Sequence, residues 1–125
     1  MRIVSVLENQ KIEKRIAITP DIAKKYIALG FKVVLLEKYG EHLGFKDDEY
    51  KELGVEIFKK EAEVLSGADI IVQLGLLSDD NLSLLKENQI LIGVFNPHIN
   101  KEIIENLAKK KINIFSLEML PRITR

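Results

Sequence analysis

The chain contains no cysteine and only two histidines, His42 and His98, among its 125 residues. Without cysteine it can form neither a disulfide framework nor a metal site built on thiolates. Two histidines are too few for a metal site built on imidazole ligands. We therefore expect no metal site in this chain.

Long apolar runs and an excess of one charge are missing as well. No run of apolar residues approaches the ~18 residues that a membrane-spanning helix requires, and the amino terminus lacks a signal-peptide pattern. The 19 lysine and arginine residues are balanced by 19 acidic ones, whereas nucleic-acid-binding proteins carry a clustered basic surplus. The composition predicts a cytoplasmic protein that does not bind nucleic acid.

Glycine-rich phosphate-binding motifs are also absent from the sequence. The seven glycines are dispersed, and Gly40 and Gly44 are the closest pair. A dinucleotide site needs a glycine spacing that lets the backbone approach the pyrophosphate at a helix amino terminus. Neither a Walker motif nor a nucleophile elbow occurs. We therefore do not expect a nucleotide site made from these residues alone.

Short apolar segments alternate with longer amphipathic ones along the whole chain. The apolar segments, which we expect to form strands, are residues 3–7, 32–37, 55–58, 69–74, 89–95 and 112–116. Their β-branched, nearly continuous apolar composition is typical of a parallel sheet that is covered on both faces. Thr19, followed by Pro20, and Asn100 are expected to cap the two longest helices. The order predicts one α/β domain over residues 1–125, an open, mostly parallel sheet with helices on both faces in a Rossmann-like or flavodoxin-like three-layer arrangement.

Polar residues follow several of the predicted strands. In open parallel sheets, ligands bind outside the carboxyl ends of the strands. The candidates at these positions are Arg15, Gln73, Gly75, Asn96, His98, Glu118 and Arg122. Arg15 has an equally good interpretation as a partner of a surface carboxylate such as Glu13, and His98 is more typical of a residue that caps a turn. These residues alone leave their roles open.

Several motifs resemble the alanine dehydrogenase and transhydrogenase alpha-subunit superfamily. Residues 15–20, Arg-Ile-Ala-Ile-Thr-Pro, resemble its Arg-Val-Ala-x-Thr-Pro opening. Residues 45–50 and 53–57 resemble its Phe-x-Asp-x-x-Tyr and Ala-Gly-Ala-x-Ile elements, and residues 68–72 resemble its Ala-Asp-Ile-Val strand. The motifs occur in the same order and the resemblance covers the whole chain.

The final motif places the chain near the transhydrogenase branch of that superfamily. Pro121-Arg122-Ile123-Thr124-Arg125 is similar to the Pro-Arg-Ile-Ser-Arg of transhydrogenase alpha subunits. The resemblance implies that Arg122 reaches the nicotinamide end of bound NAD(H), and it makes Arg122 and Arg125 the cofactor-binding candidates. Gly75 and Asn96 stand where alanine dehydrogenases carry a lysine and a catalytic histidine. The resemblance therefore implies no catalytic acid or base in this chain.

The resemblance also implies what surrounds the chain. It suggests the amino-terminal segment of the NAD(H)-binding subunit of a proton-translocating NAD(P) transhydrogenase, inactive by itself, with NAD(H) bound by the full-length subunit and not tightly by this segment. The dinucleotide-binding domain would follow residue 125. The implied partners are the NADP(H)-binding and membrane subunits and a second copy of the full-length subunit, with the complex holding this segment at the cytoplasmic side of the inner membrane.

Two alternatives stay open at this point. One is a fragment of an alanine or saccharopine dehydrogenase-like, NAD-dependent oxidoreductase that uses other residues. The other is a non-enzymatic α/β binding module. Under the transhydrogenase interpretation we also expect an exposed apolar patch, because one face of the segment would pack on residues outside it.

Overall fold

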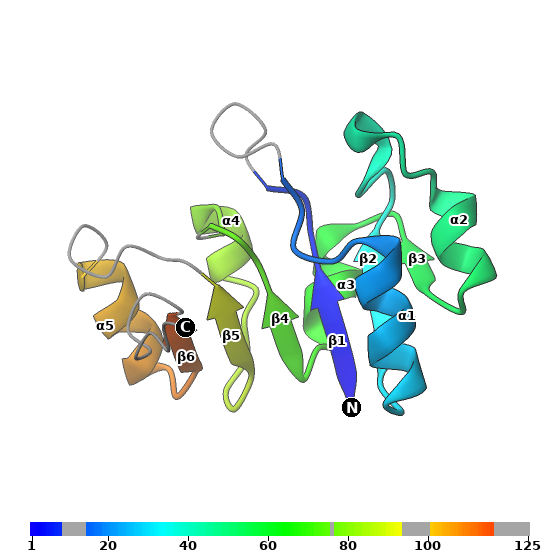
Figure 1. Cartoon of the computed structure of the whole chain (residues 1–125). Coiled ribbons are helices and arrows are strands. Elements are labelled where there is room, and N and C mark those ends of the chain that lie inside the picture. The colour runs from blue at the N-terminus through cyan, green and yellow to red at the C-terminus, as the bar shows by residue number, and fades with distance from the viewer. Residues whose placement is uncertain (9–14, 76, 94–100, 117–125) are drawn as a thin grey trace, which may run out of the picture.

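The computed structural model of the chain describes residues 1–8, 15–75, 77–93 and 101–116. Within these residues six strands form one sheet in the order β3-β2-β1-β4-β5-β6 (Figure 1). The strands are β1 (Arg2–Ser5), β2 (Lys32–Leu36), β3 (Glu56–Phe58), β4 (Ile70–Val72), β5 (Ile90–Gly93) and β6 (Asn113–Ser116). All neighbouring pairs are parallel. This confirms the predicted open parallel sheet.

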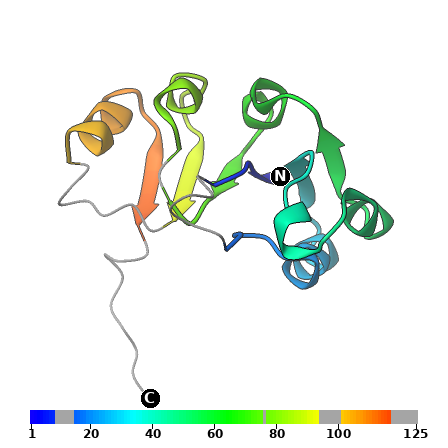
Figure 2. The ribbon, with the colours of Figure 1, turned by 90° about the horizontal axis from the view of Figure 1, so that it is seen from above.

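Helices cover both faces of the sheet, as the alternating pattern predicts. They are α1 (Pro20–Ala28), the 3-10 helix η1 (Glu41–Leu43), α2 (Asp47–Glu52), α3 (Glu61–Ser66), α4 (Asp79–Leu82) and α5 (Lys101–Lys109). Seen from above, α3, α4 and α5 lie on one face and α1 and α2 on the other (Figure 2). None of the helices in these ranges is long and apolar enough to span a membrane.

The signals that begin and end α1 act as the sequence predicts. Thr19 has an extended backbone, and its hydroxyl oxygen accepts a hydrogen bond from the Ile22 N–H at 3.4 Å. Pro20 takes the first helical position, where its missing N–H costs nothing. Gly30 follows the helix with φ +96°, a left-handed conformation that side chains disfavour. The chain is thereby turned directly into β2.

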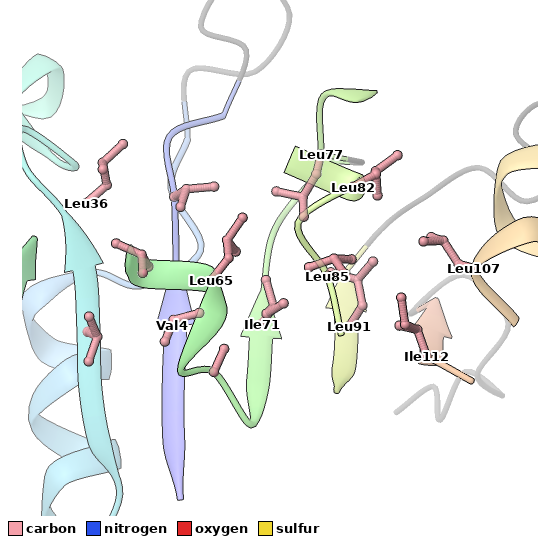
Figure 3. Close-up of a cluster of buried hydrophobic side chains, with 14 residues drawn as sticks. Val4, Leu36, Leu65, Ile71, Leu77, Leu82, Leu85, Leu91, Leu107 and Ile112 are labelled. Carbon is pink, nitrogen blue, oxygen red and sulfur yellow. The ribbon is translucent and has the colours of Figure 1, made fainter. Parts of the chain in front are cut away.

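Two apolar cores lie on the two faces of the sheet. Val4 and Val6 point into the larger core, which contains Leu65, Ile71 and Leu91 and is closed by α3, α4 and α5 (Figure 3). The side chains in between along β1 face the smaller core under α1 and α2. This alternation follows from the two-residue period of a strand. Both faces of β1 and β2 are therefore buried.

One half of one sheet face carries no helix among the described residues (Figure 2). Leu91 of β5 packs into the larger core with Ile114 of β6. The side chains between them, Ile90, Ile92 and Phe115, therefore point to the opposite face, and Phe115 is 51% exposed. We call these three residues the open half-face. It matches the expected exposed apolar patch.

The strand order reverses direction between β1 and β4. From β1 the chain proceeds to β2 and β3 on one side, and then crosses to β4, β5 and β6 on the other. Ligands of doubly wound sheets bind in the crevice outside the carboxyl ends of the strands at such a switch point. The predicted strands 3–7 and 69–74 end earlier than expected here, at Ser5 and Val72, because the two strands separate at this position. The switch point is thus the first place to look for a site.

Candidate functional site at the carboxyl ends of β1 and β4

The side chain of Gln73 fills the gap where β1 and β4 separate. It is 2% exposed. Its Oε1 accepts a hydrogen bond from the Val6 N–H at 2.8 Å, and its Nε2 donates to the Val6 carbonyl at 3.1 Å. The side-chain amide therefore acts as a peptide group and continues the pairing of the two strands by one step. Its own backbone N–H donates to the Ile92 carbonyl of β5 at 2.9 Å.

The carboxylate of Glu8 closes the outer end of this gap. Its Oε2 accepts hydrogen bonds from Gln73 Nε2 at 2.7 Å and from the Leu74 N–H at 2.9 Å. Its Oε1 accepts one from the Gly75 N–H at 2.9 Å. Hydrogen bonds to an ionised oxygen are about twice as strong as neutral ones. The end of β1 is therefore bound firmly to the first two residues after β4.

A buried tyrosine joins the same network from β2. Tyr39 is fully buried, and its hydroxyl oxygen accepts hydrogen bonds from the N–H groups of Ala17 and Ile18 at 3.0 and 3.1 Å. The phenol proton is left for Ser5 Oγ, 2.9 Å away, which in turn lies 2.8 Å from Gln73 Oε1. Burial raises the pKa of Tyr39 to about 12, so that the phenol stays neutral and keeps its donor.

A second tyrosine fixes the segment that carries the Arg-Ile-Ala-Ile-Thr-Pro motif. Tyr50 Oη donates to the Ile18 carbonyl at 2.8 Å, and its ring meets that of Tyr39 edge to face with centroids 6.2 Å apart. Burial raises the pKa of Tyr50 as well. Both backbone groups of Ile18 are thus held by tyrosine hydroxyls. Arg15, whose side chain is exposed, begins this anchored segment at the rim.

A pocket of about 310 Å³ opens beside Glu8 on the side of α3 and α4. It is lined by Leu7, Glu8, Glu61, Gln73, Leu77, Ser78 and Asn81. Asn81 Nδ2 donates a hydrogen bond to Glu61 Oε2, which joins α4 to α3. No cationic side chain occurs in this set of lining residues, and two of them are carboxylates. The pocket is suited to polar, uncharged or cationic groups and not to anions.

The structure brings together two of the candidate residues named from the sequence. Gln73 and Gly75 meet at the switch point, with Glu8 as their common partner. Asn96, His98, Glu118, Arg122 and Arg125 lie outside the described residues, as does Glu13. The assignment of Arg122 and Arg125 to cofactor binding therefore stays a prediction.

Sequence reasoning did not single out Glu8, Ser5 or Tyr39. A signal for the network was present, because Ser5 and Gln73 are polar residues inside otherwise apolar strand segments. A buried polar residue is expected to have a hydrogen-bond partner. The partners could not be named, since Glu8 and Gln73 are 65 positions apart in the sequence.

Known proteins with similar sequences and folds point to one family. The sequence model of the alanine dehydrogenase/PNT N-terminal domain matches residues 5–125. The chain is 38% identical over 129 residues to an NAD(P) transhydrogenase subunit alpha protein of Rickettsia prowazekii, an alignment that covers 100% of this chain and 34% of that protein. The chain thus spans about a third of the length of this curated relative.

Solved structures agree with the sequence match. The crystal structure of transhydrogenase from Sinorhizobium meliloti superimposes with a TM-score of 0.89 at 29% identity, over 98% of this chain and 36% of that chain. An L-alanine dehydrogenase superimposes with a TM-score of 0.85 at 18% identity, over 93% of this chain and 32% of that chain. The second likeness, at such low identity, concerns the fold alone.

Proposed function

This chain belongs to the alanine dehydrogenase/PNT N-terminal domain family, and we propose that it forms the first segment of the NAD(H)-binding subunit of an NAD(P) transhydrogenase. That enzyme moves a hydride between NAD(H) and NADP(H) and couples the transfer to proton translocation. The 38% identity to a transhydrogenase alpha subunit over the whole chain supports this branch of the family.

The rim around Gly75 is the observation that carries the proposal. Its backbone N–H is bound to the Glu8 carboxylate, and it offers no side chain that could hold a substrate carboxylate or exchange a proton. A direct hydride transfer needs neither, because the protein only has to position two nicotinamide rings and exclude water. A dehydrogenase that aminates an oxo acid needs both. The rim suits the first reaction better than the second.

The cofactor contacts are divided, in this proposal, between this segment and later residues. The sequence has no glycine-rich loop to hold a pyrophosphate. The dinucleotide-binding domain that follows residue 125 in the full-length subunit holds NAD(H), and the present segment closes the cleft from one side. Arg122 fixes the nicotinamide end with its planar guanidinium, and Arg125 lies in the same loop. The segment by itself binds NADH weakly or not at all.

The remaining assignments follow from the same branch. The partners are the NADP(H)-binding and membrane subunits of the complex, and the full-length subunit forms a homodimer. The segment is held at the cytoplasmic side of the inner membrane through that complex. It performs no step of proton passage itself, and it contains no catalytic acid or base.

Two assays of the assembled complex test the proposal. NADH oxidation should proceed with an NADP analogue as acceptor, and it should not proceed with pyruvate and ammonia. The reason is that Gly75 and Asn96 supply neither the cation nor the proton carrier that oxo-acid amination requires. A turnover on the order of 10 per second with pyruvate, typical of enzymes, would move the chain to the dehydrogenase alternative.

A further inference from the structure

Two successive backbone N–H groups point at one carboxylate at the switch point. The Leu74 N–H binds Glu8 Oε2 and the Gly75 N–H binds Glu8 Oε1, each at 2.9 Å. Successive backbone N–H groups directed at one place form an anion-binding site. This site lies where a doubly wound sheet presents its ligand crevice. Its occupant here is a side chain of the same chain.

We propose that the Leu74–Gly75 backbone is a carboxylate-binding site that Glu8 occupies permanently, so that Glu8 closes the switch-point crevice to small carboxylates. Glu8 is in this sense a specificity-determining residue, because it rejects ligands that the fold would otherwise accept. The inference goes beyond the proposed function, since it concerns which ligands the rim excludes and does not depend on hydride transfer.

Glu8 is held in this position by more than the two N–H groups. Gln73 Nε2 donates a third hydrogen bond to it at 2.7 Å. The Gln73 amide is itself 2% exposed and fixed by both backbone groups of Val6. A carboxylate tethered in this way competes with a free one at a high effective concentration. An external carboxylate therefore loses the competition as long as Glu8 is present.

The surroundings leave no place for a second anion. A Cβ on residue 75 would lie 3.4 Å from Glu8 Oε1, which is an ordinary contact. A cationic side chain introduced there would therefore meet the Glu8 carboxylate before it met a ligand. The adjoining pocket adds the Glu61 carboxylate, and its described lining contains no cation to offset the two charges. Like charges at such a site disfavour a further anion.

Acetate binding to Glu8→Ala tests the proposal in the full-length protein, prepared with ¹⁵N-labelled leucine and glycine. Acetate is titrated against chloride at constant ionic strength while the amide resonances of Leu74 and Gly75 are followed. We expect no saturable acetate-specific shift in the wild type. In Glu8→Ala we expect saturable shifts at both amides, with an apparent affinity at least about tenfold higher, equivalent to about 1.4 kcal/mol.

Glu61→Ala is the matched control, since it removes the same charge from the same pocket and leaves the two N–H groups occupied. It should behave as the wild type does. Equal acetate binding by Glu61→Ala, or acetate binding at Leu74 and Gly75 in the wild type, would overturn the proposal. The proposal also fails if Glu8→Ala shows no acetate-specific shift.

A thermal measurement covers the case in which Glu8→Ala is poorly folded. A ligand that binds only the folded state raises its melting temperature. Acetate should therefore stabilise Glu8→Ala more than chloride does, and should not do so in the wild type. Equal effects of the two salts on the variant would count against the site. No cofactor is present in either measurement, so the outcome is separate from that of the hydride-transfer assays.

Discussion

At the scale of single residues, the described part of the rim is arranged by side chains that imitate backbone. Gln73 takes the place of a peptide group between β1 and β4, and Glu8 takes the place of a bound anion at Leu74 and Gly75. Both act over a sequence separation that no local pattern reveals. The polar character of Ser5 and Gln73 within apolar segments could be read from the sequence, but their partners could not.

Gln73→Leu should destabilise the protein, because it leaves both backbone groups of Val6 without partners in a buried place. An unsatisfied buried polar group costs about 1–3 kcal/mol, so we expect the free energy of unfolding to fall by roughly 2–4 kcal/mol for this pair. Denaturant titration measures the loss. A value within about 0.5 kcal/mol of wild type, as for a surface substitution, would contradict the role given to Gln73.

Gln89→Leu is the matched control for this prediction. Gln89 is also a buried amide, and its Nε2 donates to the Leu65 and Ala68 carbonyls at 2.7 and 3.0 Å. It precedes β5 and so lies at the opposite, amino-terminal edge of the sheet. Both variants should lose stability. Only Gln73→Leu should speed hydrogen exchange at the Leu74 and Gly75 amides at conditions where both remain folded.

Arg122→Ala in the full-length subunit should slow hydride transfer from NADH to an NADP analogue. A charge-assisted hydrogen bond contributes roughly 1.5–3 kcal/mol, so we expect a loss of about 10- to 150-fold in rate or in NADH affinity. Arg122→Lys should recover little, because an ammonium group does not reproduce a planar fork of donors. The assay is transhydrogenation by the assembled complex, with NADH affinity determined separately.

Arg125→Ala is the control for this substitution, since it removes the same charge from the same loop. Its effect should be clearly smaller than that of Arg122→Ala. If the two variants are equally damaging, or if Arg122→Ala stays within about threefold of wild type, less than one kcal/mol, Arg122 has no special role at the nicotinamide ring.

At the scale of helices and strands, periodicity predicted the order of the elements and their capping, but not the point where strands part. The alternating apolar segments gave all six described strands, and Thr19, Pro20 and Gly30 gave the bounds of α1. The ends of β1 and β4 were predicted too late. Strand ends at a switch point are decided by the divergence of neighbours that are distant in sequence, which local patterns do not contain.

The open half-face, Ile90, Ile92 and Phe115, should make this 125-residue chain associate with itself. Exposed contiguous apolar surface binds hydrophobic dyes and other apolar surfaces. Phe115→Lys should lower dye fluorescence and shift the chain towards monomer in sedimentation, because Phe115 is 51% exposed on this face. In the full-length subunit we expect further residues to cover the same face.

Leu29→Lys serves as the comparison, since Leu29 is 74% exposed at the end of α1 and away from the open half-face. It should leave association unchanged. A wild-type chain that stays monomeric at high concentration and binds no dye would show that the half-face is not an association surface.

At the scale of the whole molecule, the chain is a doubly wound domain whose switch point is closed by its own side chains. The crevice that other sheets of this kind use for a ligand holds Gln73 and Glu8 here. A domain of this kind is suited to flank a cofactor that is bound elsewhere. The central claim is that its parent enzyme transfers a hydride directly from NADH to a second nicotinamide.

NADH deuterated at C4 of the nicotinamide tests this claim most directly. The assembled complex is offered the labelled NADH together with an NADP analogue, pyruvate and ammonia, and the products are weighed by mass spectrometry. We expect the deuterium in the reduced NADP analogue, without dilution by solvent protons, because a direct transfer moves the hydride as a unit. Deuterium in alanine, or a reduced NADP analogue that carries only solvent hydrogen, would contradict the account.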